Sequence, residues 1–401
     1  GPDNGGSSPP PRADKLRLSS RCDHIIRRME PFDVNRLSSE RRIGAMVLAA
    51  GRGSRMRSLQ PKPLHLLCGR PMAGYVMEAL EALNLESTVV VVGYEAETVT
   101  KILHEQAADA LRVEFVEQTV QRGTGDAVSV GLQSLEPHEL DDDQFDLMVL
   151  PGDTPLLRSS TLVKLHQTHV ESGAAATLLT AQLEDPRGYG RVVREGDGQV
   201  DRIVEDIDAT PEELEICEVN TSIYCFDRSV LMAALRKVGT RNALGEYYLT
   251  DVIKVLSGTG HSVAALVIDD PDEIHGVNDR QQLAECESVL RQRTNSKWMA
   301  AGVTMLDPDA TYIDATVVLS SDVTLFPNTL LQGDCVIGEG SQIGPDVRLT
   351  DTFVGAQCQI QSTSAVESRI EDNCRIGPYA VLDSGVEVAS GTVTGPFFNS
   401  S

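Results

Sequence analysis

The C-terminal part of the chain repeats an aliphatic residue every six positions. The repeat runs from Ile313 to Val388, with phase slips near residues 351 and 367, and Gly, Asp, Asn and Ser fill the turns between. A helical period of 3.6 residues cannot generate a strict period of six, whereas a parallel β-helix turns one such residue inward on each short face. We therefore predict that residues 303–395 form a left-handed parallel β-helix of hexapeptide repeats, with loops at the two slips. The residues expected to point inward are Ile313, Leu319, Leu325, Leu331, Ile337, Ile343, Leu349, Val354, Ile360, Ile370, Ile376, Leu382 and Val388.

Upstream of this repeat, apolar runs of strand length alternate with segments of helical spacing. Such alternation predicts a Rossmann-like α/β domain over residues 43–277, in which helices cover a mainly parallel sheet and ligands bind at the carboxyl ends of the strands. Residues 278–302 are expected to form a helical linker, because Gln281–Met299 has helical spacing and no Gly or Pro. The expected strands are Ala45–Ala50, Thr88–Val92, Val113–Val116, Leu147–Leu150, Ala175–Thr180, Ile223–Phe226 and Val263–Ile268, and the expected helices are Met72–Leu83, Ala96–His104, Ala127–Leu135, Thr161–Val170 and Val230–Val238.

Residues 1–42 are too poor in apolar side chains to fold alone, and we predict a disordered tail there. Because residue 1 is not Met and no apolar signal segment follows, the chain is expected to be a fragment, a processed end or a product with a tag remnant.

The net charge and the cysteine spacing indicate which partners and which cellular compartment to expect. The 35 Lys and Arg against 59 Asp and Glu give a net charge of −24. A surface this acidic repels nucleic acid and anionic membranes, so neither is an expected partner. No apolar run approaches the ~20 residues of a membrane span. The eight cysteines are scattered without a Cys-x-x-Cys pair, which predicts reduced thiols in a cytoplasmic protein.

The run Ala45–Ala50 leads directly into a glycine-spaced turn that basic side chains follow. Gly51 and Gly53 allow backbone conformations closed to residues with a Cβ and bring N–H groups near an anion, while Arg55 and Lys62 add positive charge. The turn fits neither a Walker loop nor the dinucleotide fingerprint, which needs a third glycine. We predict that it binds a polyphosphate. A tight turn with solvated arginines is the alternative.

Two further motifs fall where strands of the predicted sheet end. The run Leu147–Leu150 leads to Asp153, a lone carboxylate near phosphate donors. This suits Mg²⁺, which takes few carboxylates and fills its octahedron with water and phosphate oxygens; a helix N-cap is the competing explanation. The glycine-flanked turn from Gln118 to Asp126 opens a helix, and its amides and backbone groups could read the edge of a base. An ordinary strand-to-helix turn is the alternative there.

These motifs together resemble one enzyme family. Leu48-Ala-Ala-Gly-Arg-Gly-Ser-Arg-Met56, followed by Pro61-Lys62, resembles the signature of sugar-1-phosphate nucleotidylyltransferases. The continuation Pro-Lys-Pro-Leu-His-Leu-Leu-Cys-Gly-Arg-Pro-Met is most similar to the bacterial N-acetylglucosamine-1-phosphate uridylyltransferase family. Full members of that family are bifunctional and also acetylate glucosamine-1-phosphate. The likeness runs from about Ile43 to about Leu382.

The resemblance implies Mg²⁺-dependent transfer of UMP from UTP to N-acetylglucosamine-1-phosphate, for peptidoglycan precursor synthesis, by a homotrimer associated through the β-helix. Because the attacking phosphate is already an anion, no general base is needed, and catalysis is alignment and charge neutralisation. The implied catalytic residues are Arg55 and Lys62, and the implied Mg²⁺ ligands are Asp153 and Asn278. The implied substrate contacts are Leu48, Ala49, Ala50, Gly51, Gly53, Gly152 and Asn278, together with Gln118, Gly123 and Thr124 at the uracil and Gly190, Glu205 and Asn220 at the N-acetylhexosamine.

The chain departs from the family pattern at several positions. Asp126 stands where histidine is usual, Pro151 precedes the Gly-Asp pair, and Ser222 stands where glycine is usual. No histidine follows His275, and the coil at Tyr379 lacks the usual arginine, so acetyl transfer by this chain alone is not expected. Three alternatives stay open: another sugar-1-phosphate or nucleotide, such as glucose-1-phosphate or dTTP; a non-catalytic regulatory subunit; and a fragment of the bifunctional enzyme.

Overall fold

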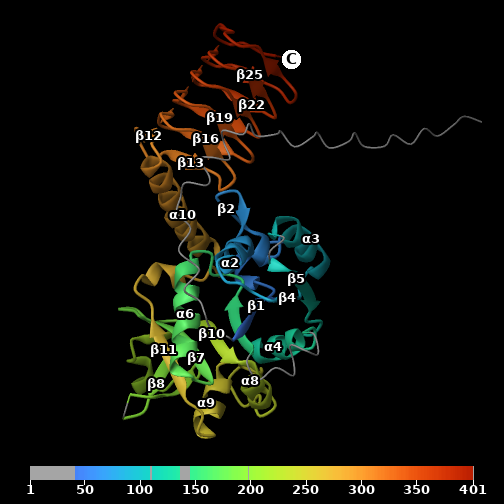
Figure 1. The fold of residues 1–401 in the computed structure, drawn as a ribbon, viewed down its shortest axis with the longest axis vertical. Coiled ribbons are helices and arrows are strands. Elements are labelled where there is room, and N and C mark those ends of the chain that lie inside the picture. The colour runs from blue at the N-terminus through green and yellow to red at the C-terminus, as the bar shows by residue number, and fades with distance from the viewer. Residues whose placement is uncertain (1–40, 109–110, 136–144, 197, 401) are drawn as a thin grey trace, which may run out of the picture. The chain divides into compact units, whose positions relative to one another are not determined.

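The computed structural model describes residues 41–108, 111–135, 145–196 and 198–400, and its first part is built on one large sheet (Figure 1). The predicted tail falls outside these residues except for Arg41 and Arg42, and Arg42 begins the first strand. The strands are β1 (Arg42–Ala49), β4 (Thr88–Val92), β5 (Val113–Glu117), β6 (Phe145–Pro151), β7 (Ala176–Gln182), β8 (Arg191–Arg194), β9 (Val200–Val204), β10 (Glu218–Asp227) and β11 (Val263–Val267), beside a hairpin of β2 (Leu66–Leu67) and β3 (Arg70–Pro71). The helices are α2 (Met72–Leu80), α3 (Ala96–Gln106), α4 (Thr124–Leu132), α6 (Ser159–Ser172), α7 (Pro211–Leu214), α8 (Arg228–Leu235) and α9 (Asp251–Gly258), with 3-10 turns η2 (Ser54–Met56), η3 (Lys62–Leu64) and η5 (Pro271–Ile274).

The strand order of the sheet is β11-β7-β10-β6-β1-β4-β5, with β8 and β9 attached beside β10. Along this path every pair is parallel except those that β10 makes with β6 and β7. The prediction of a mainly parallel α/β sheet is therefore confirmed. Because β6, β1, β4 and β5 are parallel neighbours, their carboxyl ends lie at one edge of the sheet.

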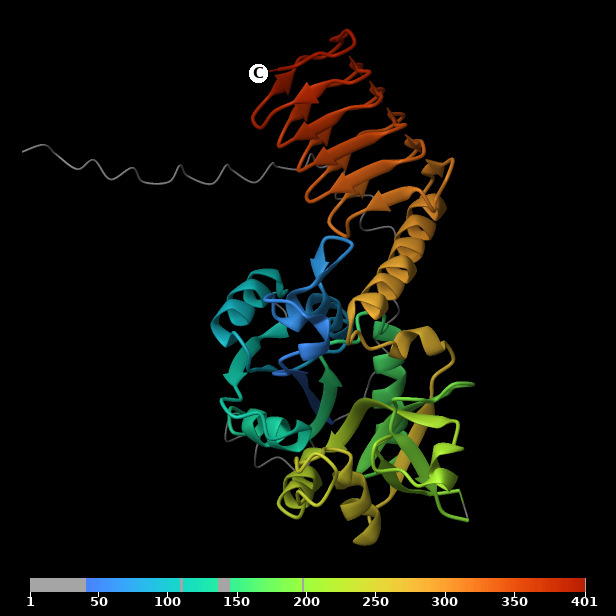
Figure 2. The same cartoon turned by 180° about the vertical axis from the view of Figure 1, so that it is seen from behind.

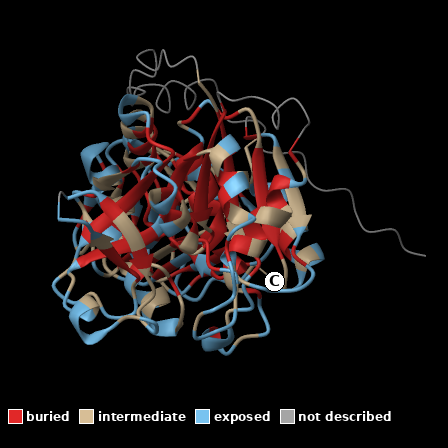
Figure 3. Ribbon diagram, turned by 90° about the horizontal axis from the view of Figure 1, so that it is seen from below, coloured by how far each residue is buried: buried red, intermediate tan, exposed pale blue. Residues whose placement is uncertain are grey.

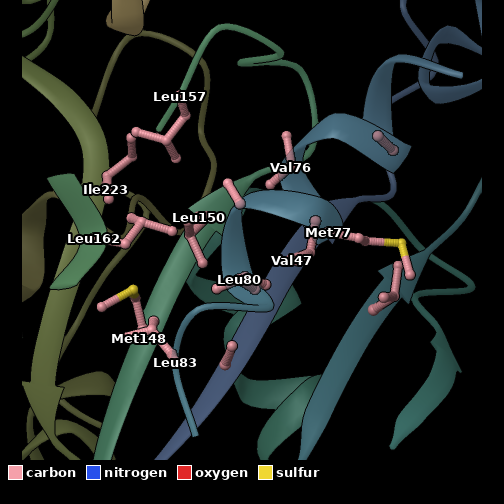
Figure 4. Packing of buried hydrophobic residues seen from close by; sticks show 14 of the residues in the cluster. Val47, Val76, Met77, Leu80, Leu83, Met148, Leu150, Leu157, Leu162 and Ile223 are labelled. Carbon is pink, nitrogen blue, oxygen red and sulfur yellow. The ribbon is translucent and has the colours of Figure 1, made fainter. Parts of the chain in front are cut away.

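Helices cover both faces of the sheet, and Figure 3 shows buried strands in the middle of the molecule. Strand β1 is buried on both sides. Alternate residues of a strand point to opposite faces. Val47 therefore packs in the cluster that holds Val76 and Leu80 of α2 and Leu150 of β6, as Figure 4 shows. Met46 points the other way, into the cluster that includes α4, α8 and α9. Burial on both faces explains why this strand is a continuous apolar run and not an alternating one.

The sequence pattern does not reveal several elements of this part, among them the hairpin β2–β3, the antiparallel pair β8–β9, and the helices α7 and α9. The hairpin strands are only two residues long, which is too short for any periodicity to show. The helix expected from Ala127 begins at Thr124, inside the glycine-flanked turn.

A single helix, α10 (Arg280–Ala300), follows this part of the chain at the position predicted for the linker. Asp279 caps it, since its carboxylate accepts from the N–H groups of Gln281 at 3.0 Å and Gln282 at 2.9 Å. The cap fixes the position of Asn278, the residue directly before it. Although α10 is long, no helix in the described part of the chain is apolar enough at sufficient length to cross a membrane.

The rest of the chain winds into a parallel β-helix (Figure 2). Three five-stranded parallel sheets form its faces: β12-β15-β18-β21-β24, β13-β16-β19-β22-β25 and β14-β17-β20-β23-β26. Every residue predicted to point inward belongs to its buried core, so the hexapeptide prediction is confirmed. The strands are β12 (Thr304–Met305), β13 (Thr311–Ile313), β14 (Val318–Leu319), β15 (Thr324–Leu325), β16 (Thr329–Gln332), β17 (Val336–Ile337), β18 (Gln342–Ile343), β19 (Val347–Thr350), β20 (Phe353–Val354), β21 (Gln359–Ile360), β22 (Ser364–Val366), β23 (Arg369–Ile370), β24 (Arg375–Ile376), β25 (Val381–Leu382) and β26 (Glu387–Val388).

The two phase slips are shorter coil corners, and the prediction of loops there is wrong. Leu349 and Val354, which are consecutive core residues, are five positions apart instead of six. Ala365 takes the inward position between Ile360 and Ile370, again at five-residue steps, and it is fully buried. It pairs in register with Leu349 of the preceding coil, so the stack continues without an insertion. The aliphatic pattern misses Ala365 because alanine is smaller than the Ile, Leu and Val residues that define the repeat.

Candidate active site

The ends of β1 and β6 bring the predicted phosphate turn next to the predicted metal ligand. The two strands are parallel neighbours, and the Gly152 N–H donates to the Leu48 carbonyl at 2.9 Å. A Cβ on Gly152 would lie 3.2 Å from the Cβ of Ala49, so the two backbones approach closely here. Asp153 therefore follows β6 beside the turn that starts at Gly51.

Four predicted site residues converge around one amide oxygen. The Lys62 ammonium forms an ion pair with the Asp153 carboxylate and donates to Asn278 Oδ1 at 2.9 Å. Arg55 Nη2 donates to the same Oδ1 at 2.9 Å, although Arg55 and Asn278 are 223 positions apart in the chain. The Val277 N–H donates to the Asp153 carbonyl at 2.9 Å, which fixes the Asn278 segment to the end of β6.

Gly53 shapes the turn that carries the two cationic side chains. Its φ of 62° lies in the left-handed region that glycine adopts readily, and a Cβ there would lie 2.7 Å from the Cβ of Lys62. The Lys62 side chain is only 13% exposed, so its packed stem directs the ammonium to Asp153. Arg55 is exposed and can meet an incoming anion.

Asp153 and Asn278 offer oxygens that suit a hard divalent cation. Mg²⁺ binds one or two carboxylate or carbonyl oxygens of a protein and keeps several waters or phosphate oxygens. The Lys62 ammonium contacts both oxygens, which shows that the pair accommodates positive charge. The Asp153 side chain is 27% exposed, so water and phosphate can reach it. The residues present therefore fit one Mg²⁺ ion.

A second group of potential ligands lies at the other end of β6, where Asp146, His169 and Cys225 place one ligand atom each within 4.8 Å of one another. The carboxylate there is already engaged, because Arg41 Nε donates to Oδ1 at 2.8 Å and His166 Nε2 lies 3.0 Å from Oδ2. Burial alone would raise the pKa of Asp146, but hydrogen bonds from His166, His169 and Arg41 hold that pKa well below its usual range. We interpret this group as a buried structural ion-pair network.

The residues predicted to contact the uracil base lie in the turn that follows β5. Gln118 is buried, and its N–H donates to the carbonyl of Val92, at the end of β4, at 2.8 Å. Gly123 has a φ of 111°, and a Cβ there would lie 2.5 Å from the Tyr247 carbonyl. The Gly125 N–H donates to that same carbonyl at 2.8 Å. The turn is thus closed against a segment more than 100 residues downstream.

The three residues predicted at the sugar come from three segments that the structure brings together. The Gly190 carbonyl accepts from the Asn220 N–H at 2.8 Å, and a Cβ on Gly190 would lie 3.5 Å from Glu205 Oε2. Burial raises the pKa of Glu205, although the Thr250 hydroxyl donates to it at 2.9 Å. Asn220 Nδ2 donates to the Tyr224 hydroxyl at 2.8 Å, while its buried Oδ1 has no partner among the described residues. An unused buried acceptor suits a ligand that donates a hydrogen bond.

The backbone at Ser222 explains why the family usually has glycine at this position. It has a φ of 62° in a bulge of β10, where the pairing register with β7 shifts between Asn220 and Tyr224. Glycine adopts this backbone conformation without strain, whereas serine pays a steric cost there.

Several residues that the sequence motifs do not reveal hold the predicted site in place. Besides Thr250, these include Leu249, whose N–H donates to the Thr124 hydroxyl at 3.0 Å. Arg280, at the start of α10, donates from Nε to the Met56 carbonyl at 3.2 Å and so braces the phosphate turn. Leu249 and Thr250 lie in a run of polar and aromatic residues just before α9, which has no period that would mark them.

Comparisons with known proteins identify the family of the chain. Residues 45–196 match the family model of the MobA-like NTP transferase domain. The chain is 43% identical over 353 residues to the bifunctional protein GlmU of Heliobacterium modesticaldum, an alignment that covers 88% of this chain and 75% of that protein. The chain belongs to the GlmU family. It is also 44% identical over 355 residues to the bifunctional protein GlmU of Pelotomaculum thermopropionicum, with the same shares of both chains covered.

Membership of the GlmU family makes this chain a sugar nucleotidyltransferase. The part that matches the MobA-like model contains the predicted phosphate turn at Gly51, the turn after Gln118, and Asp153. NTP transferases of this type typically depend on a metal ion, which agrees with the oxygen pair at the end of β6.

Proposed function

We propose that this GlmU-family chain transfers UMP from UTP to N-acetylglucosamine-1-phosphate and releases pyrophosphate. The observation that carries the proposal is the convergence of Arg55, Lys62, Asp153 and Asn278 at the edge where β1 and β6 end. Two cationic side chains beside a carboxylate and an amide oxygen provide what a reaction between two phosphate anions requires. We place this activity in residues 43–277 together with the first residues of the linker.

The side chains of this site bind and align the substrates. In the reaction, an oxygen of the sugar phosphate attacks the α-phosphorus of UTP in line, and the bond to pyrophosphate breaks. That oxygen carries no proton at neutral pH, so the protein does not have to remove one. Lys62 releases Asp153 and neutralises a phosphate oxygen instead, while the exposed Arg55 and the N–H groups around Gly51 hold the triphosphate.

Asp153 and Asn278 would hold Mg²⁺. When bound, the ion neutralises negative charge on the nucleotide and on the sugar phosphate. The sugar would lie against Gly190, Glu205 and Asn220, where the unpartnered Oδ1 of Asn220 can accept from a hydroxyl or an amide N–H.

The test is pyrophosphate release from UTP, measured with a panel of sugar-1-phosphates with and without Mg²⁺. We expect Asp153→Ala to lower kcat by a factor on the order of 10² or more, and to weaken Mn²⁺ binding measured by electron paramagnetic resonance. Asp269→Asn is the matched control, because the Asp269 side chain is 90% exposed and forms a surface ion pair with Lys164. If Asp153→Ala keeps most of its activity at saturating Mg²⁺, the metal assignment is wrong.

The same panel separates the remaining alternatives. Faster turnover with glucose-1-phosphate or dTTP would identify a different substrate pair. No turnover with any pair would favour a regulatory subunit.

We also propose that the chain acts in the cytoplasm as a homotrimer that associates through its β-helix. The described cysteines are all unpaired, as in a reducing compartment. Tyr312, Val366 and Val381 expose apolar surface on the coils. Sedimentation equilibrium at micromolar concentration tests the trimer, and a monomer there would contradict it.

A further inference from the structure

The orientation of the Gln118 amide follows from the chemistry of its neighbours. Its side-chain nitrogen lies 2.8 Å from Asp126 Oδ2 and 3.2 Å from the Gly123 carbonyl oxygen. A carboxylate and a carbonyl can only accept hydrogen bonds. The amide atom that faces both must therefore be Nε2, and both of its hydrogens are used.

The oxygen of the same amide is left as a fixed acceptor. Across residues 41–108, 111–135, 145–196 and 198–400, no donor reaches Gln118 Oε1. Gln118 is only 4% exposed, so the amide cannot swing into solvent. Reversing it in place would set a carbonyl oxygen against two acceptors, which is costly when the groups are buried. Asp126, in the first turn of α4, is the charged partner that prevents this reversal.

Gln118 lies at the correct distance from the phosphate turn to meet the base of a nucleotide. It follows β5, and β4 alone separates β5 from β1, which leads into the turn at Gly51. Two strand spacings amount to about 10 Å, a span that a ribose with its 5′-phosphate can bridge. Gln121 Nε2 donates to the Ala50 carbonyl at 2.6 Å and so connects the turn after β5 to the turn after β1.

We propose that Asp126 is a positioning residue for base selection, because it holds Gln118 as an acceptor toward the bound base. This inference rests on the nucleotide site of the proposed function. Uracil carries an N–H donor at N3, whereas cytosine, a base of the same size, has a lone pair there. A fixed acceptor at Gln118 Oε1 accepts a hydrogen bond from the uracil N3–H group and repels the lone pair on cytosine N3. Asp126 thereby makes the chain select UTP over CTP.

Substitution of Asp126 by Asn removes this constraint with little change in size. The amide of asparagine can donate or accept, so it can donate to a reversed Gln118 amide. The reversal then sacrifices only the longer hydrogen bond to the Gly123 carbonyl, and Gln118 can offer its NH₂ group to cytosine N3. We expect the ratio of kcat/KM for UTP to that for CTP to fall roughly ten- to a hundredfold, with most of the change in KM. Asp126→Glu keeps an acceptor-only partner and should retain a preference for UTP. Glu117→Gln, which removes an exposed carboxylate next to Gln118, is the matched control and should leave the ratio unchanged.

The experiment combines pyrophosphate release with calorimetric binding of UTP and CTP, for the wild type and each variant in the full chain. Asp126→Ala serves as a second variant in case Asp126→Asn does not fold. A lost preference in these two variants, with the preference kept in Asp126→Glu and Glu117→Gln, supports the proposal. If Asp126→Asn and Asp126→Ala both retain the wild-type ratio of kcat/KM for UTP to that for CTP, or if the wild type itself prefers CTP, the role of Asp126 is overturned. A wild type that binds UTP over CTP but turns over no sugar phosphate would instead overturn the proposed function.

Discussion

Replacing Asp146 by Asn tests the ion-pair network at the amino end of β6. Asp146 is fully buried, and its carboxylate accepts from Arg41 Nε at 2.8 Å and from His166 Nε2 at 3.0 Å. Hydrogen bonds to a charged group contribute about 1.5–3 kcal/mol each, and breaking a buried pair costs about 3–5 kcal/mol. Asparagine keeps the shape of the aspartate side chain, but its NH₂ group faces one of these donors and cannot accept a hydrogen bond from it. We therefore expect the free energy of unfolding of this region to fall by about 3–5 kcal/mol.

Native-state hydrogen exchange, followed by mass spectrometry on peptides from β6 and α6, measures this loss. Each 1.4 kcal/mol is tenfold, so the amides should exchange roughly 10² to 4 × 10³ times faster than in the wild type. Asp227→Asn is the control, since Asp227 binds the same Arg41 at 3.1 Å but its side chain is 20% exposed, and it should cost about 1 kcal/mol. If exchange in Asp146→Asn stays within tenfold of the wild type, the network does not stabilise the fold as argued.

Asp146 also determines how the stability of the fold changes at acid pH. The pKa of Asp146 is lower in the folded chain than the value of about 3.9 expected when unfolded. Its contribution to stability is therefore complete above that unfolded value and is lost as the pH falls toward the folded one. Below about pH 4 the wild type should lose stability more steeply than Asp146→Asn. Parallel acid denaturation curves for the two proteins, followed by circular dichroism, would refute this reasoning.

Three further predictions concern the turn, the β-helix and the thiols. Gly53→Ala should lower kcat at least about tenfold in the pyrophosphate assay, because the left-handed backbone costs about 1–2 kcal/mol and the new Cβ displaces the Lys62 side chain. Leu331→Ala should destabilise the β-helix by about 2–5 kcal/mol in urea unfolding, whereas Leu330→Ala, one residue away on the outer side, should cost less than half as much. Cys217 should be the first described thiol to react with iodoacetamide at pH 8, because it is exposed, while burial raises the pKa of Cys335 to about 11; peptide mapping that shows equal rates would contradict this.

Much of the fold was predictable because its signals are local. A six-residue period has one structural explanation, and strand-length apolar runs between helical segments have few others. The shorter corners were not predictable, since a five-residue step produces the same break in phase as an inserted loop. Ala365 was missed because only the stacked coil around it shows that its small side chain points inward.

The candidate site also contains residues that a local sequence pattern marks and residues that none marks. Gly51 and Asp153 could be found because each directly follows an apolar strand, a relation contained within a few residues. Thr250 and Arg280 could not, because their partners Glu205 and Met56 are distant in the chain and no local pattern marks them.

The sequence by itself determined the two architectures, the glycine-spaced turn and the types of residue available for phosphate chemistry, since each depends on neighbours within a few positions. Only the tertiary structure decided that Arg55, Lys62, Asp153 and Asn278 meet at one point, and that the Gln118 amide faces one way. The physical reason is that strand order and helix placement set the distances between residues remote in the chain, and hydrogen bonds and ion pairs form only over a few ångströms.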